Sequence, residues 1–153
     1  MKVLSVDAAW SKPWAFALFN NEILCYCDKV KELDEIPDKD VDYVVTESPY
    51  PGGKIKQYSY KGRAETFKTL CFAVGMVIQF SKSIGAQYQL VRPVDWKSFY
   101  KLTKKTPANI QETIRTQLTD IQSDKDLQDA VLIGRYFVEH LSARLELGEV
   151  SRQ

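Results

Sequence analysis

Four acidic side chains stand where their type and spacing could build a metal site. Asp7 ends the apolar run VLSVD, Glu47 ends the run YVVTE, and Asp126 and Asp129 share the segment DKDLQDAVLIG. A carboxylate near a buried strand end costs several kcal/mol unless it is paired or bound to a cation. Four oxygen donors without a histidine or a thiol suit a hard cation such as Mg²⁺ or Mn²⁺. The pattern therefore predicts a divalent-metal site built from three separate segments.

The residues around Asp7 and Glu47 alternate between apolar and polar in a way that predicts strands. Two further β-prone runs meet at Asn20–Asn21, which favours a tight hairpin. The first three strands should therefore be antiparallel, and the fourth can pair with the first in parallel, so that Asp7 and Glu47 meet at one sheet edge. The five predicted strands cover residues 2–8, 14–20, 22–28, 42–47 and 87–92.

Helical periodicity completes an α/β pattern with a mixed five-stranded sheet and helices packed on it. Gly75 lies in the middle of the first predicted helix, where a glycine costs about 1 kcal/mol against alanine. It indicates either close packing against another helix or a sheet, or ordinary tolerance. The predicted helices are residues 63–82, a short helix opening at Pro93, a helix from Pro107 to about Leu118, and one from Ser123 or Asp124 to about Leu147.

The last predicted helix carries the second pair of acids. Asp126 and Asp129 are three residues apart and therefore neighbours on one helix face. Apolar positions let that face lie against the sheet, so all four acids can converge; these positions are Ala130, Ile133 and Phe137. Alternatively, Asp126 is the third helical residue after a Ser123 cap and only favours the helix dipole. Asp124 is five residues from Asp129 and should point elsewhere.

The net charge of +1 hides a strong asymmetry along the chain. Residues 1–48 carry five basic and ten acidic groups, residues 49–105 carry eleven and two, and residues 106–153 carry five and eight. Cations neutralise phosphates and aromatic rings stack on bases, so the central block predicts a nucleic-acid surface rather than only a solvated one. Its two groups are Lys54, Lys56, Lys61 and Arg63 with Tyr50, Tyr58 and Tyr60, and Lys97, Lys101, Lys104 and Lys105 after Trp96, Phe99 and Tyr100.

Length and composition favour one globular domain over residues 1–153, since 44% of the residues are apolar and 27% are charged. The three cysteines lack CxxC spacing and fall in apolar runs, which predicts reduced, at least half-buried thiols and no zinc site. No leader or long apolar segment is present, so we expect a cytoplasmic protein without a membrane partner. Ala8-Ala9 takes the place of glycines that would approach a nucleotide phosphate, which disfavours a nucleotide-binding protein of the actin-like type. No organic cofactor is expected.

The order of these acids resembles the RNase H-like nuclease superfamily, and specifically the RuvC-type Holliday-junction resolvases, including phage-borne members. Four segments carry the resemblance over nearly the whole chain: VLSVDAAWSKPWAFALF, VTESPY, AVGMVIQFSKSIGAQYQLVRPVDWK and DLQDAVLIGRYF. The chain departs from the bacterial pattern after the first acid, because Asp7-Ala8-Ala9 stands where D-P-G is usual. The following loop should therefore have a different shape.

The resemblance implies a metal-dependent endonuclease that resolves four-way and related branched DNA junctions, leaving 5′-phosphate and 3′-hydroxyl ends. Two Mg²⁺ ions per site, with Mn²⁺ as a substitute, would be held by Asp7, Glu47, Asp126 and Asp129. Family members place a junction-opening aromatic shortly after the second acid; Tyr50 is the matching position here, with Tyr58 and Tyr60 as rivals. Paired nicks imply a homodimer, for which the stripe of helix 63–82 is either the interface or simply core. The alternatives are a nuclease for structured RNA, flaps or forks, or a junction-binding protein without turnover.

Overall fold

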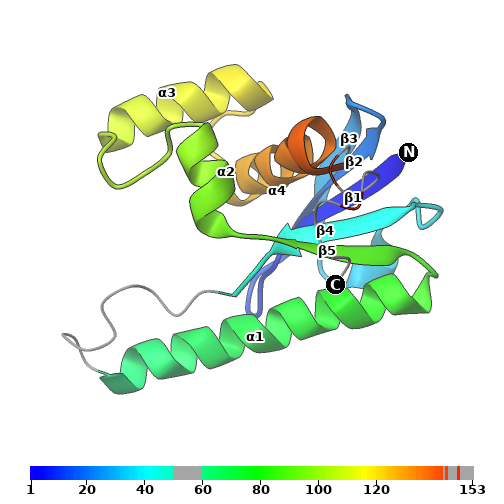
Figure 1. The fold of residues 1–153 in the computed structure, drawn as a ribbon. Helices are drawn as coiled ribbons and strands as arrows, with labels where there is room; N and C mark the ends of the chain where they lie inside the picture. The colour runs from blue at the N-terminus through cyan, green and yellow to red at the C-terminus, as the bar shows by residue number, and fades with distance from the viewer. Residues whose placement is uncertain (50–59, 143, 145–147, 149–153) are drawn as a thin grey trace.

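The computed structural model describes residues 1–49, 60–142, 144 and 148, with backbone only for residues 60–64 (Figure 1). Five strands form one mixed sheet in the order β3-β2-β1-β4-β5. This confirms the predicted architecture. The strands are β1 (Lys2–Asp7), β2 (Trp14–Asn20), β3 (Ile23–Val30), β4 (Tyr43–Glu47) and β5 (Gln87–Val91).

The pairing of the strands follows the prediction in its directions. β1 pairs with β2 and β2 with β3 in antiparallel fashion, whereas β1 with β4 and β4 with β5 are parallel. The β2–β3 hairpin is tight, because Asn20 is paired with Ile23. Asn21 adopts a φ of 54°, in the left-handed region that asparagine enters more readily than most residues.

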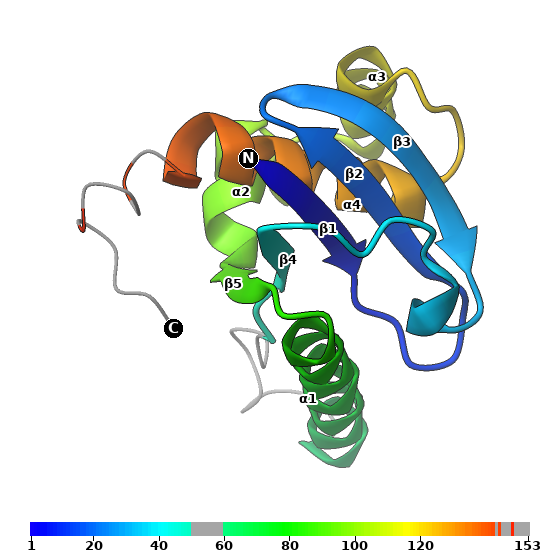
Figure 2. The same ribbon diagram turned by 90° about the vertical axis from the view of Figure 1, so that its right-hand side faces the viewer.

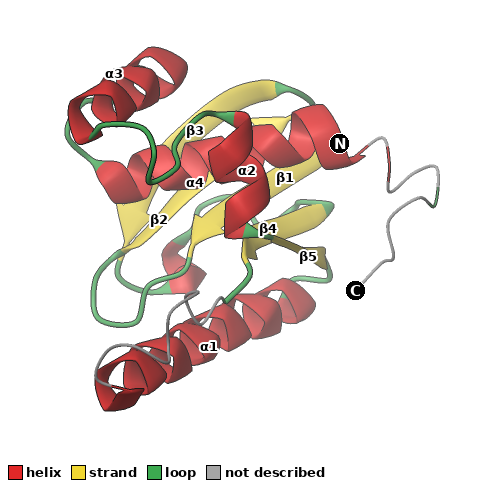
Figure 3. Cartoon of the chain, turned by 60° about the vertical axis from the view of Figure 1, so that its left-hand side comes forward, coloured by secondary structure: helices red, strands yellow, loops and turns green. Residues whose placement is uncertain are grey.

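Helices cover both faces of the sheet (Figures 1 and 3). One face carries α4 and α2, with α3 packed on α4, and the other carries α1 and the short 3₁₀ turn η1 (Figure 2). Each face has its own apolar core, built around Phe19 and Phe137 on the α4 side and around Phe16 and Phe80 on the α1 side. The helical elements are α1 (Tyr60–Ser83), η1 (Leu33–Glu35), α2 (Pro93–Phe99), α3 (Ala108–Thr119) and α4 (Lys125–Tyr136), followed by a π-helical turn, η2 (Phe137–Leu141).

Several local predictions are wrong. The last helix is not continuous α-helix, because its turn at Phe137–Leu141 is π-helical. Cys25 is exposed, although all three cysteines are free thiols as predicted.

No helix in the described ranges combines the length and apolar composition needed to cross a membrane.

The two helical glycines differ in their surroundings. A Cβ at Gly75 would meet nothing within 4 Å, so the prediction that Gly75 marks close packing within the chain is wrong. A Cβ at Gly134 in α4 would instead clash with the ring of Phe19 and lie 2.9 Å from the Oγ of Ser5. Gly134 therefore allows α4 to lie directly on β1 and β2.

We predict that Gly134→Ala destabilises the protein and that Gly75→Ala does not. Overpacking a dense core costs about 1–3 kcal/mol, and neither Ser5 nor Phe19 can move freely because both are buried. Gly75→Ala should instead gain up to about 1 kcal/mol of helix propensity in open space. Urea unfolding of both variants at low protein concentration checks this, and equal stabilities would contradict the close approach at Gly134.

Candidate active site

Strand alternation places Asp7 and Glu47 side by side on the α4 face of the sheet. β1 and β4 run parallel, with Val6 opposite Thr46, and Asp7 and Glu47 are the last residues of the two strands. The preceding residue on the same face of β1, Ser5, donates a hydrogen bond to the carbonyl of Ala130 in α4. Period-2 alternation therefore points the two carboxylates toward the side of the sheet that α4 covers.

The first turns of α4 bring the other two acids to the same place. Asp124 is the N-cap, and its carboxylate accepts a hydrogen bond of 3.1 Å from the backbone N–H of Leu127. The predicted Ser123 cap is therefore wrong, and Asp124 also pairs with Lys29 at 2.8 Å, away from the other acids. Asp126 and Asp129 lie on successive turns. The apolar positions predicted for this face are fully buried, namely Ala130, Ile133 and Phe137.

Basic side chains contact three of the four acids. Lys12 donates to both oxygens of Asp126, at 2.9 and 3.1 Å. Arg115, which is buried in α3, forms a short ion pair with Asp129. Neither basic residue was predicted at the site from the sequence, because each reaches it from another segment through tertiary packing.

Glu47 is held by two consecutive residues of α2. The indole Nε1 of Trp96 donates a hydrogen bond of 2.7 Å to Oε2 of Glu47. The ammonium of Lys97 lies 3.4 Å from the same oxygen and 5.1 Å from the centre of the Trp96 ring. Trp96 is fully buried, so it fixes the position of this carboxylate.

The carboxyl group of Asp7 interacts electrostatically with the other three acids. The pKa of Asp7 is raised to about 8, first by burial and then by the carboxylates of Asp129, Asp126 and Glu47 in that order, against a smaller lowering by Lys12. No hydrogen bond or ion pair to Asp7 is found among the described residues. The four predicted acids therefore form one electrostatically coupled cluster centred on Asp7.

The cluster has the donor chemistry of a divalent-cation site. All four side chains offer carboxylate oxygens, which suit a hard cation, and the pKa of Asp7 is raised first by burial and then by the three neighbouring carboxylates. Within the described part of the chain, no three acids, histidines or cysteines already surround one point closely enough to hold a metal. Asp126 and Asp129 face Lys12 and Arg115 instead, so a cation would have to displace the exposed ammonium of Lys12.

The predicted DNA-binding residues are only partly described. Tyr50, Lys54, Lys56 and Tyr58 lie outside the described residues, and Lys61 and Arg63 fall in the first turn of α1, where only the backbone is described. Lys97 lies beside Glu47, whereas Lys101, Lys104 and Lys105 are exposed in the loop after α2. The described lysines thus extend from the acidic cluster along one side of the molecule.

Comparison with known proteins identifies the fold. No protein-family profile and no curated protein sequence matches the chain. Among solved structures, Thermus thermophilus RuvC matches with a TM-score of 0.58 and 14% sequence identity over 97% of each chain. T. thermophilus RuvC in complex with a Holliday junction substrate matches with the same score and identity over 95% of this chain and 96% of that one. The chain therefore has a RuvC-like, RNase H-like fold, as the sequence predicted.

We predict that Asp7→Asn stabilises the protein at alkaline pH in EDTA. The folded-state pKa of Asp7, about 8, lies above its value in the unfolded chain, so the native state binds the proton more tightly and stability falls as pH rises toward 8. Each pKa unit corresponds to about 1.4 kcal/mol. Allowing for relaxation of neighbouring side chains, the variant should be more stable than wild type by about 2 kcal/mol at pH 8.5 and by little at pH 5.

Urea unfolding at the two pH values measures this difference. Asp120→Asn is the matched control, because Asp120 is exposed and its φ of 58° is one that asparagine also adopts. Its stability should follow that of wild type at both pH values. Parallel profiles for Asp7→Asn and wild type would contradict the coupling of Asp7 to the other acids.

Proposed function

We propose that this chain is a metal-dependent endonuclease that cuts branched DNA, and four-way junctions in particular. The observation that carries the proposal is the convergence of four carboxylates from β1, β4 and α4 on Asp7, in a RuvC-like fold. The T. thermophilus RuvC structure with a Holliday junction substrate supports the choice of DNA. The expected products are a 5′-phosphate and a 3′-hydroxyl.

Asp7, Glu47, Asp126 and Asp129 would hold two Mg²⁺ ions, for which Mn²⁺ would substitute. When bound, such cations lower the pKa of the attacking water and stabilise the leaving oxygen of the phosphodiester. Asp7 is the central ligand in this proposal, because the other three acids all raise its pKa and it lacks a basic partner within the described residues.

The protein's own contacts prepare the cluster for this role. Trp96 and Arg115 are both buried and hold Glu47 and Asp129 in fixed orientations. Lys12 differs, because 58% of its side chain is exposed and it can leave Asp126 for solvent. We infer that Lys12 moves aside when a cation binds, whereas Arg115 stays.

In this proposal the basic residues of segment 49–105 bind the DNA. Lys101, Lys104 and Lys105 are exposed beside the cluster and would contact phosphates together with the predicted residues of the 50–63 segment, with Tyr50 as the aromatic that opens the junction. Each neutralised phosphate releases counterions. Junction affinity should therefore fall steeply as the salt concentration rises.

A junction-binding protein without turnover is the second candidate. The observation that favours it is that three of the four acids already pair with basic side chains. It differs from the first proposal in two respects: Mg²⁺ would not affect junction binding, and no branched substrate would be cut.

Two symmetrical nicks require a two-fold dimer, and α1 offers a surface for it. Phe72 and Met76 are 54% and 42% exposed, and they share one face of the helix with the open position at Gly75. Trp10, which is 57% exposed, extends this face, since its ring centre lies 5.8 Å from that of Phe72. Large apolar side chains exposed together indicate an interaction site.

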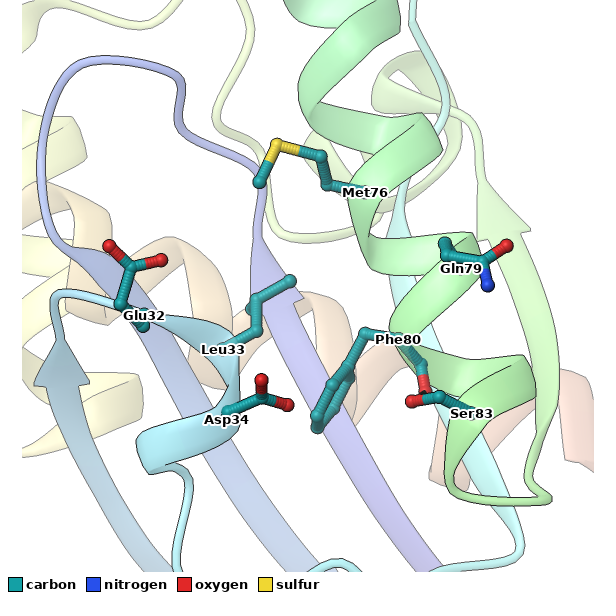
Figure 4. A pocket seen from close by; sticks show the side chains of 7 residues that line it. All are labelled: Glu32, Leu33, Asp34, Met76, Gln79, Phe80 and Ser83. Carbon is teal, nitrogen blue, oxygen red and sulfur yellow. Dashed lines mark hydrogen bonds between the residues drawn. The ribbon is translucent and has the colours of Figure 1, made fainter.

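A hollow continues this face between α1 and η1 (Figure 4). Met76 stands at one end of it, and Leu33 and Phe80 contribute apolar side chains farther along. Side chains from a second copy could fill it, which would extend the contact beyond the aromatic pair. The opposite side of α1 packs on the sheet through Ala73 and Val77. The apolar stripe predicted for residues 63–82 is therefore part of the core on that side, and the face that carries Phe72 is the one available for the dimer.

We predict that Asp7→Asn abolishes cutting of a synthetic four-way junction in Mg²⁺. Removing the central carboxylate should lower the rate at least about 10³-fold, because one side-chain group that stabilises a transition-state charge is worth that much. Binding measured in Ca²⁺ should change less than threefold, since the DNA contacts remain. Asp120→Asn is the control and should cut normally.

A flap and an RNA hairpin tested beside the junction distinguish the nuclease alternatives. If the protein cuts the flap or the RNA in preference to the junction, that nucleic acid replaces the junction as the proposed substrate. A variant Asp7→Asn that still cuts would remove the catalytic assignment, and wild-type protein that binds but cuts nothing would favour the second candidate.

We predict that Phe72→Asp converts a dimer into a monomer. The charge would be buried without a partner in the contact, which costs several kcal/mol. Sedimentation velocity at micromolar concentration measures the change. Ile110→Asp is the matched control, because Ile110 is 45% exposed on α3, and it should leave the dimer intact. Wild-type protein that sediments as a monomer at this concentration would contradict the interface.

A further inference from the structure

A groove with a volume of about 740 Å³, large enough for a nucleotide, lies beside the end of β4. Its walls come from three places: the residues directly after β4, the exposed side of α2, and the loop that follows α2. The lining residues used below are Ser48, Pro49, Val94, Lys97, Leu102 and Lys104.

The walls of the groove combine apolar surface with positive charge. Pro49, Val94 and Leu102 provide flat or aliphatic surface, and Val94 is 61% exposed with nothing in the described chain to cover it. Lys97 and Lys104 also line the groove, and no acidic residue lines it among the described residues. Such a surface complements a nucleotide, whose base is apolar on its faces and whose phosphate is anionic.

The groove is built rather than incidental, because hydrogen bonds fix its loop. The backbone N–H of Leu102 donates to the carbonyl of Lys97 at 2.7 Å, which turns the chain back on α2. The amide of Gln111 in α3 donates to the carbonyls of Thr103 and Thr106, both at 2.9 Å. The wall that carries Lys104 is therefore held by contacts on both sides.

Lys97 connects the groove with the acidic cluster. Its ammonium lies 3.4 Å from Glu47, yet its side chain also lines the groove. A phosphate that contacts Lys97 would thus be next to the candidate metal ligands. Lys104 has no carboxylate partner among the described residues and is available to a second phosphate.

We infer that this groove binds one unpaired nucleotide of a DNA strand, with the base against Val94 and Leu102 and its phosphates on Lys97 and Lys104. The inference rests on the proposed function only for its consequence, which is that the nucleotide flanks the phosphodiester to be cut. It adds a base-contacting site to the phosphate contacts of the lysines and the junction-opening role proposed for Tyr50. The groove would then give the enzyme a preference for certain bases next to the cut.

The test is an NMR titration of the ¹⁵N-labelled protein with a single-stranded DNA tetranucleotide in EDTA, which requires no cutting. The amides of Ser98, Thr103 and Lys104 should shift. An abasic strand of the same length should bind at least about fivefold more weakly, because stacking of a base contributes to binding. Equal affinity for the two strands, or shifts confined to other surfaces, would overturn the inference.

Two variants and their controls locate the site. Val94→Glu and Lys104→Gln should each weaken tetranucleotide binding at least about fivefold, by repelling the phosphate or removing its partner. Ile110→Glu and Lys39→Gln change the same charges on surfaces away from the groove and should bind within twofold of wild type. Unchanged affinity in both groove variants, with spectra that show an intact fold, would also overturn the inference.

The outcome is separable from that of the proposed function. If junctions are cut but the tetranucleotide does not reach the groove, the inference fails and the nuclease assignment stands. If no junction is cut but the groove amides shift with the expected base dependence, the site is real and the nuclease assignment fails.

Discussion

The direct contact of α4 with the two central strands is the constraint on which the rest of the site depends. Gly134 lets the helix backbone approach Ser5 and Phe19, and Ser5 donates a hydrogen bond to the carbonyl of Ala130. These contacts fix both the height and the rotation of α4. Because a helix rises only 1.5 Å per residue, Asp129, directly before Ala130, and Asp126, one turn before it, then lie over the end of β1. A bulkier residue at Gly134 would lift the helix and separate the two halves of the cluster.

Bringing four carboxylates together has an electrostatic cost, and the protein offsets only part of it. Arg115 and Asp129 are 5% and 14% exposed, so their ion pair is a permanent part of the core. Lys12 makes a comparable contact from an exposed loop, where ion pairs contribute about 0–1 kcal/mol. Asp7 lies buried beside three carboxylates, and burial first, then their charge, raises its pKa. The fold thus holds a site with residual negative charge at its centre and a replaceable cation at its edge.

The sequence could predict the strands and their two faces because period-2 alternation acts locally, and Asp7 and Glu47 end strands as expected. The contacts of Lys12 and Arg115 could not be predicted, since each depends on how a loop or a separate helix packs on α4. At Gly75 the sequence left close packing and ordinary tolerance open, whereas the close approach is at the other helical glycine, Gly134. A glycine in a helix indicates only that a side chain is absent, and the partner surface that requires its absence is a tertiary feature.

The helix α2 links the acidic cluster to the cationic surface. Within two turns it directs Trp96 inward to Glu47, places Lys97 between Glu47 and the groove, and exposes Val94 to the groove itself. Trp96 and Lys97 both contact Glu47, and Lys97 also lines the groove together with Val94, which is three residues away on the same helix face. A DNA strand bound in the groove would contact Lys97, and Lys97 in turn contacts Glu47. Any movement of α2 on DNA binding would therefore shift the candidate metal ligand Glu47, because Trp96 and Lys97 hold its carboxylate.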